Sequence, residues 1–304
     1  MKRKSRTQDS LRVESPVAAI SLLVSSNVRT RKAYLCTHSV SIQQSTKSER
    51  TWTCGYRNAM MLCSSLGSVP SFSNAVNNSI NDLAKVPGGD LIQGTPTISY
   101  IQWLVERAWK MGYDREGASQ LRNALVGTRK WIGTSEIYSL MHSLGIKVSV
   151  TDFPQPTGPD NAHPALMDMV ESYFDGSEAE FQEAYSASDK CFPLNFTRNQ
   201  NAGVHDTERL PLYFQYQGHS LTIVGIECIE GSGARNLLVL DPGTKIPDSI
   251  TSDLAVHLQD EKSVTGALKQ FRFPESALKS KSAYQKDLPD KEDCVVTALR
   301  RAWK

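Results

Sequence analysis

The sequence has no two cysteines close enough to form half of a zinc site. Its six cysteines lie far apart, at positions 36, 54, 63, 191, 228 and 294, whereas structural zinc sites use closely spaced pairs. Long apolar runs are also missing, because no run approaches the ~20 residues that a membrane-spanning helix needs. We therefore expect a protein without metal, cofactor or membrane contact.

The chain has little net charge, but that charge is unevenly distributed. The net value is +2 for 304 residues, while residues 1–50 alone hold ten Lys or Arg against three acidic residues. This composition predicts a basic, disordered tail over residues 1–48, with one short ordered segment at 17–24. Such a tail suits weak contact with nucleic acid or another acidic partner, or nuclear import. A signal peptide is disfavoured because acidic residues interrupt the polar lead before the apolar run.

The remainder, residues 49–304, has the composition and patterning of one α+β domain. Hydrophobic residues make up 39% and charged residues 22% of the sequence, which is ordinary for a globular protein. A polar surface insertion is expected at about 175–210, because loops beyond ~15 residues are usually functional or disordered. The last thirty or so residues, which are rich in charge, are expected at the periphery. Periodicity predicts helices at 54–66, 97–111, 136–144, 163–174 and 262–271, and strands at 146–153, 211–217, 221–227 and 236–240.

The stretch around Cys54 combines a turn-like start with an amphipathic helix. Apolar residues recur at helical spacing from Tyr56 to Leu66, so Cys54 lies at or just before the first turn. Unpaired backbone N–H groups and the helix dipole favour a thiolate there and lower the pKa of the thiol. Cys54 is thus a candidate nucleophile. The alternative is a buried structural cysteine.

Two residues further along the chain are candidate partners for Cys54. His219 stands between two strand-like runs, and Asp241 ends the next strand at an Asp-Pro-Gly turn. A hairpin would bring His219 near Asp241, with the Cys54 helix packed across them. His219 would then act as general base and general acid while Asp241 orients the imidazole, an order that resembles papain-like cysteine proteases. The alternative for Asp241 is a turn-forming residue.

Gln215 lies on the same face of its predicted strand as His219, because side chains alternate with a two-residue period. Its amide could donate to an oxyanion, beside the backbone N–H of Cys54. The alternative is a glutamine that satisfies the edge of the sheet.

Five blocks of sequence together resemble one known family. They lie in order at residues 52–58, 117–121, 127–133, 217–220 and 240–243, and five ordered blocks are more specific than any one of them. They resemble the ubiquitin-fold-modifier-specific cysteine peptidases, and most of all the catalytic domain of the zinc-finger-containing deubiquitinase of that family. The resemblance covers roughly residues 50–245 with interruptions. The chain departs from the family pattern at Thr51 and Thr53, where glycine is usual, and at Met60, where a polar or β-branched residue is usual.

The resemblance implies a papain-like fold, in which a helix bearing the cysteine packs against a mainly antiparallel sheet bearing the histidine and aspartate. It also implies that Asp114 and Glu136 bind the arginines of the ubiquitin C-terminal tail, because carboxylates match guanidinium groups. Trp52 would wall the channel for the glycines of that tail. The alternatives are a helix-start preference for Glu136 and core packing for Trp52.

From this resemblance we expect a thiol-dependent deubiquitinase that hydrolyses isopeptide bonds after the C-terminal glycine of ubiquitin and favours extended lysine-linked chains. One alternative is a protease for the ubiquitin-fold modifier, but those relatives place Asp-Pro-His where this chain has Asp241-Pro242-Gly243. Another is an inactive ubiquitin-binding module, against which the intact Cys54, His219 and Asp241 weigh. The expected partners are ubiquitin and polyubiquitin chains, and we expect a monomer in the nucleus and cytoplasm.

Overall fold

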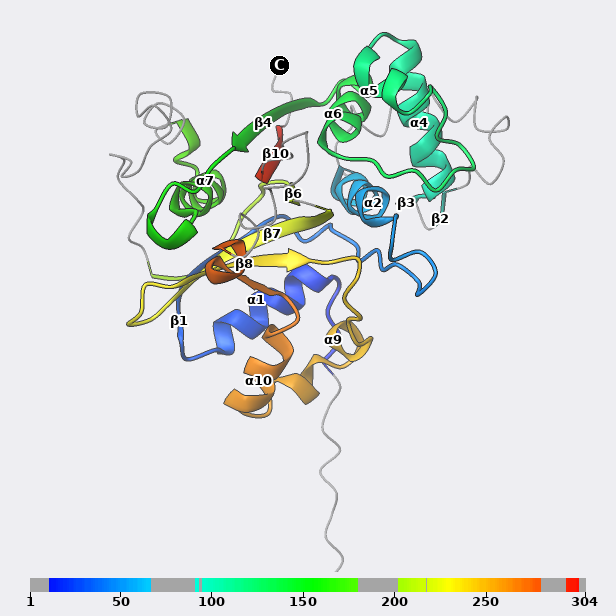
Figure 1. The fold of residues 1–304 in the computed structure, drawn as a ribbon. Helices are drawn as coiled ribbons and strands as arrows, with labels where there is room; N and C mark the ends of the chain where they lie inside the picture. Colours follow the sequence, from blue (N-terminus) through cyan, green and yellow to red (C-terminus); the bar gives the residue numbers. More distant parts are fainter. Residues whose placement is uncertain are drawn as a thin grey trace, which may run out of the picture.

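The structure is a computed structural model that describes residues 11–66, 91–92, 95–179, 202–216, 218–279 and 294–300. Its centre is one large sheet of mixed but mostly antiparallel strands, in the order β4-β10-β6-β7-β1-β5, with β8 on β7 and β9 on β8 (Figure 1). The strands are β1 (Thr30–Leu35), β4 (Lys147–Phe153), β5 (Gly203–Asp206), β6 (Leu212–Tyr216), β7 (His219–Ile229), β8 (Arg235–Leu240), β9 (Arg272–Pro274) and β10 (Cys294–Arg300).

Strand β7 organises the sheet because it pairs with three other strands. It runs antiparallel to β6 over its first half, to β1 over its second half, and to β8. The β6–β7 connection is a tight hairpin that opposes Tyr216 and His219. Gly218 has a φ of +72° in this turn, a conformation that favours glycine. The hairpin thus fixes His219 as the first residue of β7.

Helices cover the sheet on two sides and divide the core into two clusters. Figure 1 shows α1, α9 and α10 on one side and α2, α4 and α6 on the other. One cluster packs α1, α7 and α10 against the strands, and the other joins α2, α4 and α6. The helices are α1 (Pro16–Ser26), α2 (Cys54–Leu66), α4 (Ile98–Lys110), α5 (Arg115–Gln120), α6 (Thr134–Ser143), α7 (Pro164–Asp175), α9 (Ser249–Ser252), α10 (Glu261–Leu268) and α11 (Glu275–Lys279), with single turns at Pro159–Asn161 and Leu254–His257 and a small hairpin of β2 (Leu91–Ile92) and β3 (Thr95–Pro96).

The prediction of a disordered tail over residues 1–48 is wrong for much of this segment. Helix α1 begins at Pro16 behind an N-cap in which Ser15 accepts from Ala18 N at 3.2 Å, and the ordered segment predicted at 17–24 lies inside it. Strand β1 follows and pairs with β7 and β5. The basic composition of this segment does not imply disorder, because Lys32 is buried and bonds Glu171 of α7 at 2.5 Å.

The chain after 271 is not wholly peripheral either. Strand β10 is an interior strand of the sheet, because it lies between β4 and β6 and pairs antiparallel with both. The predicted insertion at 175–210 falls largely outside the described residues. Its last part differs from the prediction, since β5 pairs in parallel with β1.

The described part of the chain contains no helix that is long and apolar enough to cross a membrane. Within the same residues, no three His, Cys, Asp or Glu side chains gather as a metal ion would require.

Candidate active site

Helix α2 carries Cys54 as its first residue and is buried around almost its whole circumference. It packs against β7 and β6 on one side and against α4 on the other. The predicted apolar face is therefore only part of the buried surface, because the polar side chains of Asn58 and Ser65 are also buried. Burial on all sides fixes the position of Cys54 relative to the sheet.

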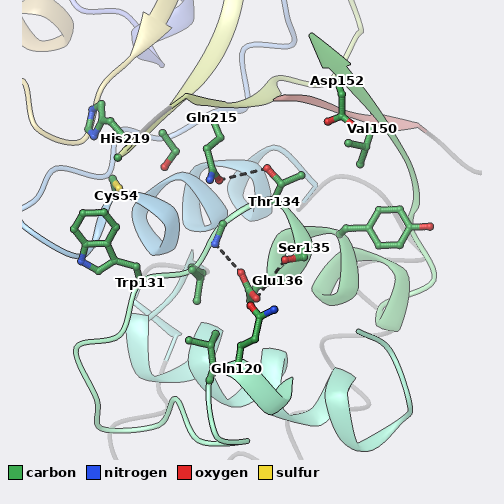
Figure 2. Close-up of a pocket in the computed structure, with 16 residues that line it drawn as sticks. Cys54, Gln120, Trp131, Thr134, Ser135, Glu136, Val150, Asp152, Gln215 and His219 are labelled. Carbon is green, nitrogen blue, oxygen red and sulfur yellow. Dashed lines mark hydrogen bonds between the residues drawn. The ribbon is translucent and has the colours of Figure 1, made fainter. Parts of the chain in front are cut away.

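The sheet delivers the two predicted partners of Cys54 to the same place. Strands β7 and β8 are antiparallel, with Thr222 opposite Leu240, so the start of β7 adjoins the end of β8. His219 Nε2 lies 3.0 Å from Asp241 Oδ1. The other ring nitrogen is left for Cys54, which lies beside His219 in Figure 2 and is one cause of the raised pKa of the imidazole. The three residues thus lie together in the predicted order.

The electrostatics of this chain favour a thiolate and an imidazolium. Burial alone would raise the pKa of Cys54, but hydrogen bonds from His219 and Ser220 and the charge of His219 lower it below its ordinary value. Burial alone would lower the pKa of His219, but its bonds to Asp241 and Cys54 raise it to about 9. Burial opposes ionisation of Asp241 too, yet the bond and charge of His219 lower the pKa of this carboxyl. These shifts favour the ionised pair over the neutral one, which prepares the thiol for nucleophilic attack.

A cleft of about 630 Å³ extends from Cys54 and His219 along α6 and β4. Figure 2 shows Cys54 and His219 at one end, and Thr134, Ser135 and Glu136 deeper along the same wall. Trp131 lines the cleft although 56% of its surface is exposed. The cleft can hold an extended peptide segment whose end lies beside the thiol.

The loop before Cys54 is fixed by Thr53, one of the departures from the family pattern. Thr53 is fully buried, its hydroxyl donates to Glu49 O at 2.9 Å, and it therefore accepts from Ser45 Oγ at 2.8 Å. Ser45 N in turn donates to Pro242 O at 2.8 Å. This departure thus connects the cysteine loop to the loop of Asp241.

The residue after Cys54 must be small because another segment crosses it. A Cβ on Gly55 would meet the carbonyl oxygen of Ile132 and lie 2.8 Å from Ile132 Cγ1. The crossing segment is itself held in place, since Tyr56 OH donates to Lys130 O at 2.8 Å and Gln102 Nε2 to Thr128 O at 2.9 Å. Glycine therefore lets the cleft wall approach the cysteine.

We expect Gly55→Ala to lower the free energy of unfolding by about 1–3 kcal/mol, the usual result of overpacking a close contact. It should also reduce activity, because the cleft wall must shift away from Cys54. Gly266→Ala is the matched control, since it is exposed in α10 with no atom within 4 Å of the added Cβ. There the substitution should raise stability by roughly 0.5–1 kcal/mol. Denaturant unfolding measures both, and equal effects would contradict the packing argument.

Gln215 lies in the cleft wall with its orientation fixed. Its Oε1 accepts from Thr134 Oγ1 at 3.3 Å and from Tyr213 OH at 3.1 Å. A Cβ on Gly133 would come within 2.8 Å of the same oxygen. Figure 2 shows Gln215 between Cys54 and Thr134, and the two hydroxyl donors direct the amide nitrogen away from Thr134. The amide of Gln215 is thus oriented as an oxyanion donor would need to be, and its oxyanion role stays a prediction.

The two predicted arginine-binding carboxylates lie close to one another but differ in their surroundings. Asp114 is the N-cap of α5, where its Oδ1 accepts from Gly117 N at 2.9 Å. Glu136 lines the cleft and accepts from Gly133 N at 2.7 Å. Burial and the negative charge of Asp114 raise the pKa of Glu136. Their predicted substrate roles remain predictions.

Trp52 packs into the core beside the cleft. Its ring meets that of Tyr56 edge to face, with centroids 5.6 Å apart, and it adjoins the α2–α4–α6 cluster. The exposed tryptophan of the cleft wall is Trp131 instead. The core alternative for Trp52 therefore matches its position.

Sequence reasoning missed two polar residues beside the thiol. Asn58 is fully buried one turn after Cys54, and Ser220 is buried directly after His219. A signal for both existed, because they lie in the two sequence blocks around Cys54 and His219 that carry the family resemblance.

A thiol beside an imidazole that a carboxylate orients, at the end of a peptide-sized cleft, defines a cysteine peptidase. A family model described as "Peptidase family C78" matches residues 29–285. The chain belongs to this peptidase family.

Similar proteins agree with this assignment. "Zinc finger-containing ubiquitin peptidase 1" of Homo sapiens is 40% identical over 195 residues, which are 64% of this chain and 28% of that protein. "Ubiquitin carboxyl-terminal hydrolase mug105" of Schizosaccharomyces pombe is 31% identical over 195 residues and is covered to 61%. The chain thus spans less than a third of the human relative. Among solved structures, "Crystal structure of UfSP from C.elegans" has a TM-score of 0.43 and 14% identity, over 98% of this chain and 39% of that one.

Proposed function

We propose that this protein is a deubiquitinase of papain-like fold, which hydrolyses the isopeptide bond after the C-terminal glycine of ubiquitin. The observation that carries the proposal is the placement of Cys54 and His219 together at the end of the cleft, with Asp241 bonded to the imidazole at 3.0 Å. Relatives named as ubiquitin peptidase and ubiquitin hydrolase support ubiquitin as the modifier.

The geometry supports a two-step reaction. The Cys54 thiolate attacks the carbonyl carbon of the terminal glycine, and the imidazolium of His219 gives its proton to the leaving lysine amine. This leaves a thioester between Cys54 and ubiquitin. Water then attacks the thioester, His219 takes the water proton, and the thiolate returns as the ubiquitin carboxylate departs. Asp241 holds the imidazole in place and stabilises its charge throughout.

The cleft supports recognition of a basic tail followed by glycines. Glu136 in its wall has a raised pKa, in part because it lies near Asp114 with its like charge. A guanidinium placed beside Glu136 would relieve that repulsion, and the arginine-containing tail of ubiquitin supplies one. Near Cys54, Ile132 of the cleft wall packs directly against Gly55, and a narrow channel at this end would suit residues without side chains.

The test is a ubiquitin probe that carries a C-terminal electrophile. We expect covalent labelling of Cys54, with a matching probe of the ubiquitin-fold modifier labelling far more slowly. Preferential labelling by the modifier probe would show that the ubiquitin-fold modifier, and not ubiquitin, is the substrate. Tight ubiquitin binding without labelling would instead indicate a binding module.

We also propose a preference for extended lysine-linked chains. The support for this preference is the family resemblance. The measurement that tests it is the rate of cleavage of diubiquitins of every linkage. Equal cleavage of all linkages would remove this part of the proposal.

Neutralising the two carboxylates tests the recognition of the tail. We expect Asp114→Asn with Glu136→Gln to raise KM for ubiquitin substrates by about tenfold or more, since each lost charge pair weakens an interface by more than 1 kcal/mol. Asparagine still caps a helix, and glutamine can still accept from Gly133 N, so the wall should survive.

The matched control is ubiquitin with its tail arginines replaced by alanine. With that substrate the double variant and the wild type should differ little, because the charge pairs are already lost. A KM that is unchanged for normal ubiquitin would remove both carboxylates from the channel.

A further inference from the structure

A short chain of hydrogen bonds leads from the residue before Cys54 to the loop of Asp241. The hydroxyl of Thr53 accepts from Ser45 Oγ at 2.8 Å. Ser45 N donates to Pro242 O at 2.8 Å, and Pro242 directly follows Asp241 in the sequence. The chain therefore joins the loop that carries the nucleophile to the loop that carries the orienting carboxylate.

Each end of this chain is bonded closely to a residue of the active site. Thr53 O accepts from Arg57 N at 2.9 Å, a bond that begins the first turn of α2. Thr53 therefore cannot move without Cys54. At the other end, Asp241 Oδ1 accepts from Gly243 N at 2.7 Å, so the carboxylate is held inside its own turn. A shift of one loop thus passes to the other.

The direction of the side-chain bonds is determined. The carbonyl oxygen of Glu49 can only accept, so it takes the single hydroxyl proton of Thr53, at 2.9 Å. Ser45 Oγ is then the donor to Thr53. Thr53 and Ser45 are 0% and 9% exposed, so water hardly competes for these bonds. A glycine, the usual residue at this position in the family that the sequence resembles, has no hydroxyl for either bond.

We infer that Thr53 is a positioning residue of the proposed reaction, whose hydroxyl fixes the loop of Asp241 relative to Cys54. The inference rests on the proposed function for the reaction that these residues perform. Thr53 acts through Asp241, which bonds His219 Nε2 at 3.0 Å. The imidazole must lie in line with both the thiol and the carboxylate, and proton transfer slows when such an alignment is lost.

The burial of Thr53 determines which kinetic constant it should affect. Its side chain is fully buried, so it cannot touch a bound peptide. Loss of its hydroxyl should therefore lower kcat and leave KM nearly unchanged. A residue that contacts the ubiquitin tail would instead change KM.

The experiment measures steady-state cleavage of a ubiquitin substrate by the full chain. In Thr53→Val, which removes the hydroxyl, kcat should fall by about 10- to 100-fold, the scale of a small misplacement of catalytic groups. Thr53→Ser keeps the hydroxyl and should restore most of kcat. Ser45→Ala removes the same bond from the other side, so the double variant of Thr53→Val and Ser45→Ala should be no slower than Thr53→Val alone.

Thr157→Val is the matched control for loss of a buried threonine hydroxyl. Thr157 is 8% exposed, lies before α7, and its Oγ1 accepts from Ala165 N at 3.1 Å. This variant should lower the melting temperature and leave kcat unchanged. A fall in kcat that merely follows stability would appear in it as well.

The role of Thr53 is overturned by an unchanged kcat in Thr53→Val, by a loss that Thr53→Ser does not restore, or by an equal loss in Thr157→Val. If Thr53→Val does not fold, an unchanged kcat in Ser45→Ala overturns it. The proposed function fails separately, if the wild type does not cleave ubiquitin substrates. Alkylation of Cys54 by iodoacetamide then tests Thr53, and it should be slower in Thr53→Val and restored in Thr53→Ser.

Discussion

Cys54→Ala should abolish cleavage of ubiquitin conjugates, with a loss of roughly 10⁵-fold or more as for nucleophile removal in other hydrolases. The thiol forms the covalent bond in both steps, and no other described group beside His219 can replace it. Alanine suits the first turn of α2, so folding and ubiquitin binding should be retained. The measurements are turnover of a ubiquitin substrate and affinity for free ubiquitin.

Cys63→Ala is the matched control on the same helix. Cys63 is buried in the α2–α4–α6 cluster, and burial raises its pKa to about 12, so it is unreactive at neutral pH. This variant should keep its activity even if it loses some stability. Retained cleavage in Cys54→Ala would show that another group is the nucleophile, whereas loss in both variants would point to misfolding.

Local patterns placed Cys54 at a helix start, His219 after a glycine turn and Asp241 at a strand end. The family resemblance then singled out these three residues together, because each local pattern alone also allowed a structural role. The start of the helix predicted at 97–111 was equally local, because Thr97 caps α4 by accepting from Tyr100 N at 3.3 Å. Signals of this kind depend on a few neighbouring residues and are therefore visible in one sequence.

The features of the fold and site that the sequence did not predict depend on partners distant in sequence. Strand β10 is an interior strand of the sheet through its pairing with β4 and β6, which no local pattern indicates. In the sequence Lys32 is one of many basic residues of the predicted tail, and only the fold brings it to its buried partner Glu171. The hydrogen bonds of Asn58 needed the register of β7, because only there do Ser220 and Thr222 face the same amide.

Asp241→Asn should lower kcat/KM by up to about 10⁴-fold, the loss known for this change in a catalytic triad, and Asp241→Ala by at least as much. The two variants separate the two tasks of this carboxylate. Its Oδ1 accepts from both His219 and Gly243 N, the latter at 2.7 Å. An asparagine oxygen can keep these contacts but carries no charge, whereas alanine loses the contacts as well.

The pH profile shows which task dominates. The ion pair exists between the pKa of Cys54, which is lowered, and that of His219, which is raised to about 9. Removing the negative charge of Asp241 takes away a cause that raises the pKa of His219, so the alkaline limb of kcat/KM should move below pH 9. A less charged imidazole also stabilises the thiolate less, so the acid limb should move upward. The active range of Asp241→Asn should therefore narrow from both sides, and an alkaline limb that stays near 9 would show that another group sets the protonation of His219.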